Sequence, residues 1–244
     1  MQSLTCELST KDGTHETSWI YRSASPTELT YIETNTVVVS RSSIAGKITR
    51  EQFDTAIFYL EARFSILRSI VLDGQFVARM DDSPTVATWL SSDSCSVDAV
   101  YASLLNSGLD TRTGIYSVHV VAGDDALDVF MRSSHAITDA TSLVELHSCL
   151  AYICDCVARG NAHQAPVALN ISDMQAVKFH WPTERLKVTG FEYALGWHKK
   201  FPNVSVSVYE GKLIANTVYV EEFFEPETIP AICESVARKL QSAC

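Results

Sequence analysis

The sequence has 244 residues, 46% of them hydrophobic and 20% charged, so it is long enough to bury a sizeable core in one large domain or two small ones. Its 29 acidic and 19 basic residues give a formal charge of -10 without any long basic run, which argues against nucleic acid as a partner. No apolar stretch reaches the roughly 20 residues of a membrane-spanning helix and no signal-peptide pattern is present, so we expect a cytoplasmic protein with no membrane partner.

The first predicted elements are a strand and a helix. Residues 31–40 are rich in strand-forming types and run into a turn-like stretch at 41–47. Thr49 and Gln52 have the capping-box spacing, and the apolar residues after them recur at helical intervals. The pattern therefore predicts a strand that ends near residue 40, followed by a helix that begins at Thr49.

The middle of the chain shows a turn signal and a second helix. Asp73 and Gly74 lie between two apolar runs, which predicts a two-residue hairpin turn. From 81 to 110 we expect a polar loop followed by a short helix at 97–107.

Two strands then lead to a histidine. Residues 115–122 and 126–133 are separated by a Gly-Asp-Asp turn and are expected to pair in antiparallel fashion. Ser142 with Glu145 forms another capping pair and predicts a long helix. His135 should therefore lie between the exit of a strand and the start of a helix.

The remaining chain suggests a division into three parts. We assign 1–165 to a first lobe, 166–183 to a crossing segment of irregular composition, and 184–244 to a reduced C-terminal part packed into the same domain. This last part contains a second hairpin and a closing helix near Pro226. Strands and helices alternate without a strict βαβ order, which favours a layered α/β fold with a mixed, largely antiparallel sheet flanked by helices.

His135 is the main candidate for chemistry. A partly buried imidazole can take a proton from a hydroxyl or amine as that group attacks a carbonyl. Asp139 could brace the loop by accepting bonds from backbone amides or by holding an arginine. The alternative interpretation is that His135 merely ends a strand and that Asp139 merely caps a helix.

The context of His135 resembles a known superfamily. The run VFMRSSHAITDATSLVELHSCLAYICDCVARG is similar to the HHxxxDG segment of CoA-dependent acyltransferases, which include condensation domains, alcohol acetyltransferases and chloramphenicol acetyltransferase. SASPTE resembles the opening signature of that family, and KITREQFDTAIFYLEARFSILRSIV resembles its first helix. YEGKLIANTVYVEEFFEPETIPAICESVARKL resembles its last hairpin and closing helix.

This resemblance implies a site and its substrates. His135 would be the general base, Ser134 would occupy the place of the first histidine, and Asp139 would be the structural aspartate that forms an ion pair. The leaving group would be the thiol of CoA or of a carrier protein's phosphopantetheine arm, used as a co-substrate with no bound cofactor. The fold would be similar to chloramphenicol acetyltransferase, with most of the second lobe missing.

The motif departs from the family pattern at two positions and reads SHxxxDA. Ser134 replaces the first histidine, and Ala140 adds a Cβ where the glycine of the family pattern allows positive φ. The short chain leaves a cleft with one wall, so a homo-oligomer could complete the site, or acyl transfer could have been lost.

A basic cluster near the C-terminus offers a second candidate site. Trp197, His198, Lys199 and Lys200 could contact a donor's phosphates, although a solvated approach to the hairpin is the favoured interpretation of them. The remaining histidines show no metal-ligand spacing, so no metal is expected.

Three functions stay open at this point. The first is acyl transfer to a hydroxyl or amine of a small natural-product-like substrate. The second is a donor-independent cyclase or isomerase that acts on an apolar biosynthetic intermediate. The third is a noncatalytic binding partner of a synthase.

Overall fold

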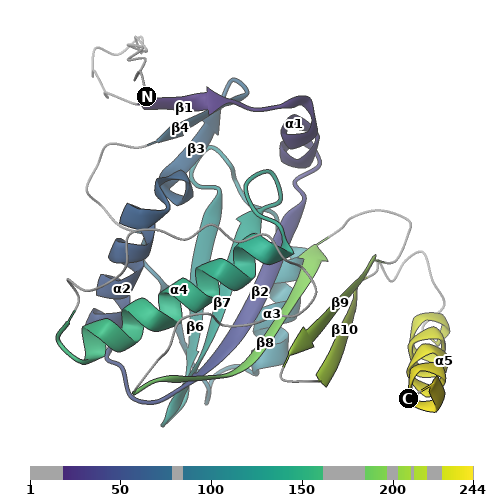
Figure 1. Ribbon diagram of the computed structural model, residues 1–244. Helices are drawn as coiled ribbons and strands as arrows, with labels where there is room; N and C mark the ends of the chain where they lie inside the picture. The colour runs from purple at the N-terminus through teal and green to yellow at the C-terminus, as the bar shows by residue number, and fades with distance from the viewer. Residues whose placement is uncertain are drawn as a thin grey trace.

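The computed structural model describes residues 19–78, 85–161, 185–196, 203–209, 212–218 and 227–243 (Figure 1). The helices are α1 (Pro26–Glu33), α2 (Arg50–Arg63), the 3-10 helix η1 (Ser65–Arg68), α3 (Val97–Asn106), α4 (Ala140–Ala158) and α5 (Thr228–Ala243). The strands are β1 (Trp19–Ser23), β2 (Val37–Ala45), β3 (Ser69–Leu72), β4 (Gln75–Ala78), β5 (Thr88–Ser91), β6 (Tyr116–Ala122), β7 (Ala126–Ser134), β8 (Lys187–Gly196), β9 (Asn203–Tyr209) and β10 (Lys212–Val218).

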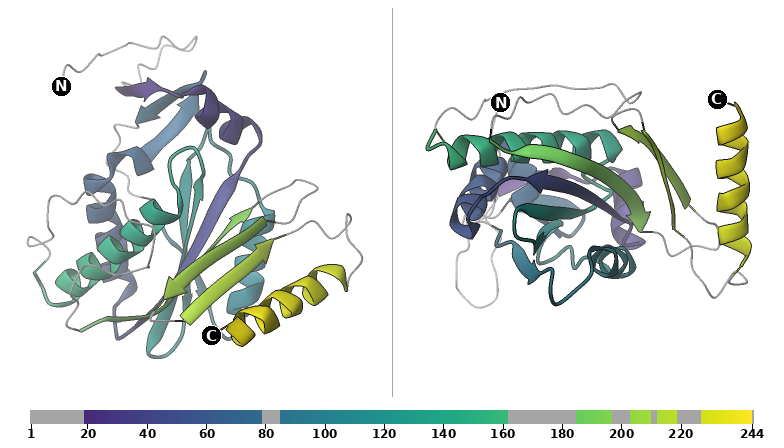
Figure 2. Two further views of the ribbon diagram at one scale, coloured as in Figure 1. Left: turned by 45° about the vertical axis from the view of Figure 1, so that its right-hand side comes forward. Right: turned by 90° about the horizontal axis from the view of Figure 1, so that it is seen from below.

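The main sheet has five strands in the order β5-β6-β7-β2-β8. β5 and β6 are parallel, and the other neighbours are antiparallel. Helices α2 and α4 cover one face of this sheet and α3 covers the other, as the view from below shows (Figure 2). The predicted layered α/β fold with a mixed, largely antiparallel sheet is therefore confirmed.

Two smaller sheets flank this body. Strands β1, β4 and β3 form a three-stranded sheet, and β9 and β10 form a hairpin. The hairpin lies beside β8, and α5 lies beyond it, away from the main sheet (Figures 1 and 2).

Several predicted elements are confirmed. The helix at Thr49 is α2, and its Thr49–Gln52 capping box is formed in both directions. The turn between β3 and β4 uses Asp73 at φ 47° and Gly74 at φ 72°, as a two-residue hairpin requires. The 97–107 helix is α3, and the strands before His135 are the antiparallel pair β6 and β7.

Other predictions were wrong, and the reasons are physical. Residues 31–40 do not form one strand, because α1 begins at Pro26 under a capping box between Ser25 and Glu28 and continues to Glu33. The stretch 41–47 is not a turn, since β2 continues to Ala45 with alternating burial along its second half.

Two further corrections concern the middle of the chain. The polar loop expected from residue 81 contains the short strand β5, which adds to the sheet edge. Helix α4 begins at Ala140 and not after Ser142, because Asp139 is the residue whose side chain accepts the hydrogen bond of the first turn.

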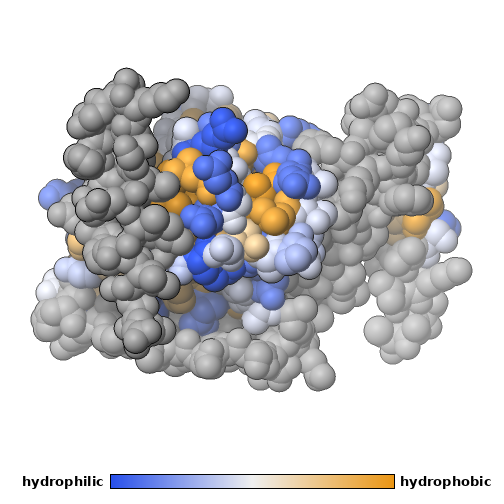
Figure 3. All heavy atoms as spheres, turned by 90° about the horizontal axis from the view of Figure 1, so that it is seen from above, coloured by the Kyte–Doolittle hydropathy of each residue, from blue (hydrophilic) through white to orange (hydrophobic). Residues whose placement is uncertain are grey.

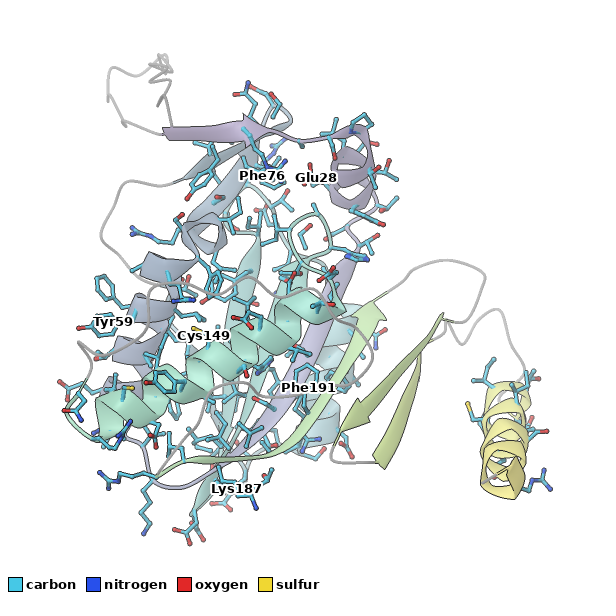
Figure 4. The ribbon with its side chains drawn as sticks, in the orientation of Figure 1. Glu28, Tyr59, Phe76, Cys149, Lys187 and Phe191 are labelled. Carbon is cyan, nitrogen blue, oxygen red and sulfur yellow. The ribbon has the colours of Figure 1, made fainter. Side chains whose placement is uncertain are left out.

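A buried histidine joins α4 to the sheet. His147 is 1% exposed, and its two ring nitrogens lie 2.8 Å from Ser40 Oγ and 2.7 Å from Ser42 Oγ, both on β2. Because the Ser40 hydroxyl donates to the Met131 carbonyl, Nε2 of His147 donates to Ser40 and the Ser42 hydroxyl donates to Nδ1. Phe191 of β8 packs edge-on against the same ring and points toward α4 (Figure 4).

Because His147 is buried in its neutral form, we expect the free energy of unfolding to fall in acid. Burial lowers the pKa of His147 to about 3, whereas an unfolded histidine titrates near about 6.5. Below about pH 6.5, His147 therefore binds a proton in the unfolded state but stays neutral in the folded state. The contribution of His147 to the free energy of unfolding is therefore fully present above the unfolded pKa. Below that pKa the contribution falls by about 1.4 kcal/mol per pH unit.

Urea unfolding of the wild type and of His147→Gln at several pH values measures the contribution of His147 to the loss of stability in acid. Glutamine keeps a donor and an acceptor but does not titrate, so the variant should lose about 2 kcal/mol less than the wild type between about pH 6.5 and about pH 5. Equal losses in the two proteins would contradict the assignment.

Helix α4 is long and apolar enough to be tested as a membrane-spanning segment. Residues 141–158 have the length and the mean hydropathy, 1.2, of a candidate spanning segment, but 61% of this window is buried inside the protein. His147 and the fully buried Asp155 face the sheet and the start of β8 from the same helix. We therefore assign α4 as a core helix of the fold.

The start of β8 is held by a buried carboxylate. Asp155 is fully buried, and its Oδ1 accepts hydrogen bonds from the backbone N–H groups of Arg185 at 2.6 Å and Leu186 at 2.9 Å. Its Oδ2 lies 3.0 Å from Arg159 Nε. Gly46, at φ 118°, leaves room for the same segment, since a Cβ there would lie 2.9 Å from the Arg185 carbonyl oxygen.

Candidate active site

The His135 loop is anchored to the ends of three adjacent strands. The N–H of Ser134 donates to the Ile115 carbonyl just before β6, and the N–H of His135 donates to the Thr36 carbonyl just before β2, both at 2.9 Å. Thr138 Oγ1 bonds to the Ser133 hydroxyl and lies 3.2 Å from the Ser134 carbonyl. The loop is thus cross-linked on both sides, which limits the movement of His135.

The ring of His135 has one occupied and one open nitrogen. Nδ1 lies 2.7 Å from the Thr138 carbonyl oxygen, and because a carbonyl can only accept, Nδ1 carries the proton. In the neutral ring Nε2 is then the basic nitrogen, and no hydrogen bond to it is made by the described part of the chain. His135 is half-buried, so Nε2 belongs to a side chain that is neither sealed in the core nor fully solvated.

An aromatic ring from α1 lies against His135. Tyr31 stacks on the imidazole with the ring centroids 4.5 Å apart and the planes at 25°. Helix α1 is itself fixed by Glu28, which accepts two hydrogen bonds from the Arg22 guanidinium. Glu28 and Phe76 lie at the same end of the molecule (Figure 4), and Arg22 lies over the Phe76 ring at 4.7 Å. The first helix therefore restricts one face of the candidate base.

Asp139 acts on the helix after the loop. Its Oδ1 accepts the N–H of Ser142 at 2.8 Å and the Ser142 hydroxyl at 2.7 Å. Partial burial alone would raise the pKa of Asp139, but these two hydrogen bonds outweigh it and hold the pKa below its usual value. Within the described ranges no arginine forms an ion pair with Asp139, so the brace is a helix cap and not the expected ion pair.

The two departures from the motif have local explanations. Ser134 is 2% exposed and its Oγ accepts the N–H of Ala136 at 3.3 Å, so the hydroxyl is part of the loop's internal bonding. Ala140 is the first residue of α4 and does not have positive φ; within the described ranges, Asn35 and Asp73 are the non-glycine residues that do. The backbone at Ala140 therefore does not require glycine.

The basic cluster cannot be compared with this site. Trp197, His198, Lys199 and Lys200 lie outside the described residues. Of the predicted site residues, the structure brings together Ser134, His135 and Asp139 in one loop.

Sequence reasoning missed three contributors to this loop: Thr36, Thr138 and Tyr31. Thr36 and Thr138 contact His135 through their backbone carbonyls, for which side-chain type gives no signal, and the Thr138 hydroxyl bonds within the loop as well. Tyr31 did have one, because Ser25, Pro26 and Glu28 form a helix-start pattern that would place Tyr31 on a helix.

The end of the molecule that carries α1 and the small sheet has a mixed surface. Viewed from above, the described residues show apolar patches bordered by hydrophilic side chains (Figure 3). Tyr21, 44% exposed, contributes apolar surface from β1. Among the described residues, no group of three or more potential metal ligands occurs.

The chain was compared with known proteins. No protein-family profile and no curated protein sequence matches it. Among solved structures it is similar to the starter condensation domain of rhizomide synthetase RzmA, with a TM-score of 0.51 and 11% identity over 62% of this chain and 42% of that one. It is also similar to polyketide synthase associated protein 5 from Mycobacterium tuberculosis, with a TM-score of 0.44 and 13% identity over 57% of this chain and 34% of that one.

The fold is therefore similar to that of the RzmA starter condensation domain, in line with the layered fold that the sequence resemblance implies. The chain spans less than half the length of either solved structure.

Proposed function

We propose that this protein transfers an acyl group from a thioester to a hydroxyl or amine of a small, natural-product-like substrate. The observation that carries this proposal is the orientation of His135. Its Nδ1 is fixed on the Thr138 carbonyl, its ring is stacked on Tyr31, and its Nε2 is left for an external proton. These are the features that a general base needs.

In the proposed mechanism, Nε2 of His135 takes the proton from the acceptor's O–H or N–H. The acceptor atom then bonds to the thioester carbonyl carbon, and a tetrahedral intermediate forms. Collapse of that intermediate breaks the C–S bond, and the leaving thiolate takes the proton back from the His135 imidazolium. Atoms and charge balance without any further reactant.

The proposed donor is an acyl thioester of CoA or of a carrier protein's phosphopantetheine arm. A carrier protein is therefore a proposed partner, and neither thioester is a resident cofactor. A second copy of the chain is proposed to enclose the acceptor, because a half-size domain provides one wall of a cleft.

One alternative is favoured by a specific observation. Ser134 is buried and bonded within the loop, so the second polar group that the family motif places beside the base is absent from the site. Such a site could promote a cyclisation or isomerisation that needs one proton transfer and no acyl donor.

A paired assay separates these functions. The protein is incubated with acyl-CoA and a panel of alcohols and amines, and the release of free thiol that depends on the acceptor is measured. Acyl transfer predicts one thiol and one acylated product per turnover. Conversion of a candidate intermediate without any thioester would favour the cyclase, and the absence of both reactions would favour a noncatalytic partner.

A further inference from the structure

Arg132 on β7 is a half-buried cation that has no anionic partner among the residues that the structure describes. It lies on the face of the sheet that α3 covers, in the same row as Val39 of β2 and Ser117 of β6. Its Nη1 bonds to the hydroxyl and the carbonyl of Ser107, just after α3. Its Nε is buried without a hydrogen bond, and no described carboxylate forms an ion pair with it.

A second arginine on the same face shows how such a charge is usually neutralised. Arg41 of β2 lies within hydrogen-bond distance of Asp128, with Nε at 3.0 Å and Nη2 at 2.9 Å from the carboxylate. Ser43 donates to the same oxygen at 2.6 Å. Burying part of a guanidinium without such a partner costs free energy. Arg41 has a carboxylate partner, whereas no described carboxylate pairs with Arg132.

The neighbours of Arg132 are hydrogen-bonding groups with no negative charge. Ser117 is its direct cross-strand partner, and Ser117 Oγ lies 3.1 Å from His119 Nε2. Burial, with a smaller effect of Arg132, lowers the pKa of His119 to about 4, so the ring is neutral near pH 7. Ser107, Ser117, His119 and Arg132 are all neither fully buried nor fully exposed. The cluster thus carries one net positive charge.

We propose that Arg132, Ser117, His119 and Ser107 form a binding site for a small oxyanion, the carboxylate or phosphate group of a ligand. The planar guanidinium offers N–H donors in a fork that matches two oxygens of such a group, and Nε is the donor left without a partner. In the tautomer in which His119 Nε2 carries the proton and donates to Ser117 Oγ, the Ser117 hydroxyl is a third donor from the adjacent strand. This site lies on the α3 face and does not depend on acyl transfer at His135.

Titration with inorganic phosphate, and separately with acetate, tests the site. Binding is followed by calorimetry and by the NMR signals of the His119 ring. We expect saturable binding, and a rise in the pKa of His119 when the anion is bound, because a nearby negative charge favours the imidazolium. Tighter binding of phosphate than of acetate would identify the ligand group as a phosphate, and the reverse order would identify a carboxylate.

Two variants connect the binding to this cluster. Arg132→Gln should weaken phosphate binding by about tenfold or more, since it removes the charge-assisted hydrogen bonds. Arg41→Gln is the matched control, because its guanidinium is already paired with Asp128, and it should leave binding within about twofold. If Arg132→Gln does not fold, Ser117→Ala replaces it with a smaller expected loss. Equal effects of the two arginine variants, or no saturable change at His119, would overturn the proposal.

Discussion

Replacement of His135 by asparagine is expected to lower the rate of acyl transfer by about 100-fold to about 10,000-fold, the usual contribution of a general base. Asparagine can still donate from its amide to the Thr138 carbonyl, which is the bond that Nδ1 makes at 2.7 Å. It cannot accept a proton from the attacking hydroxyl or amine. The loss should therefore appear in the turnover number, with the fold unchanged.

The measurement is the rate of thiol release that depends on the acceptor, together with the melting temperature of both proteins. A melting temperature that stays within a few degrees shows that the loop is intact, because the anchors on the Thr36 and Ile115 carbonyls come from the backbone. A variant that folds normally and keeps the wild-type rate would exclude His135 as the base.

Variants of Tyr31 extend this test to the support of the ring. The Tyr31 ring lies 4.5 Å from the imidazole, so Tyr31→Leu removes a flat surface against which His135 is held. Tyr31→Phe keeps the ring and should retain more of the activity than the leucine variant. Equal losses in the two variants would indicate that the hydroxyl matters and the stacking does not.

The sequence predicted the loop of His135 because its signals are local. A largely buried strand, β7, ends at Ser134, and Asp139 lies at the N-cap of a helix with an apolar face. These patterns operate over a few residues and do not depend on the rest of the chain. The side chain that caps α4 was nevertheless assigned to Ser142, because serine and aspartate compete for the same role within one turn.

Two other features were not predictable from local signals: the stacking of Tyr31 on His135, and the pairing of β2 with β8. Tyr31 lies more than one hundred positions before His135 in the sequence, and no spacing rule connects the two residues. The C-terminal part at 184–244, which we expect to pack into the same domain, supplies β8, and β8 pairs with β2 in the main sheet. Pairing at such a distance in sequence depends on long-range contacts that local propensity does not encode.

The buried carboxylate of Asp155 provides the strongest test of how β8 is held. Asp155→Ala is expected to lower the free energy of unfolding by about 3 to 5 kcal/mol, as found when one partner of a buried pair is removed. The change removes the side-chain acceptor of the N–H groups of Arg185 and Leu186, and it removes the carboxylate oxygen that lies 3.0 Å from Arg159 Nε. Each unpaired buried donor adds its own desolvation cost.

Chemical denaturation of three variants separates charge from hydrogen bonding at this position. Asp155→Asn keeps one oxygen for the backbone N–H groups but presents an amide to Arg159, so its loss should lie between that of the alanine variant and zero. Asp98→Ala is the matched control, because the Asp98 side chain is 97% exposed and lies 4.0 Å from Arg41, so its loss should stay within about 1 kcal/mol. If Asp155→Ala were no more destabilising than Asp98→Ala, β8 would be held by its pairing with β2 alone, and the carboxylate would have no part in joining the C-terminal region to the sheet.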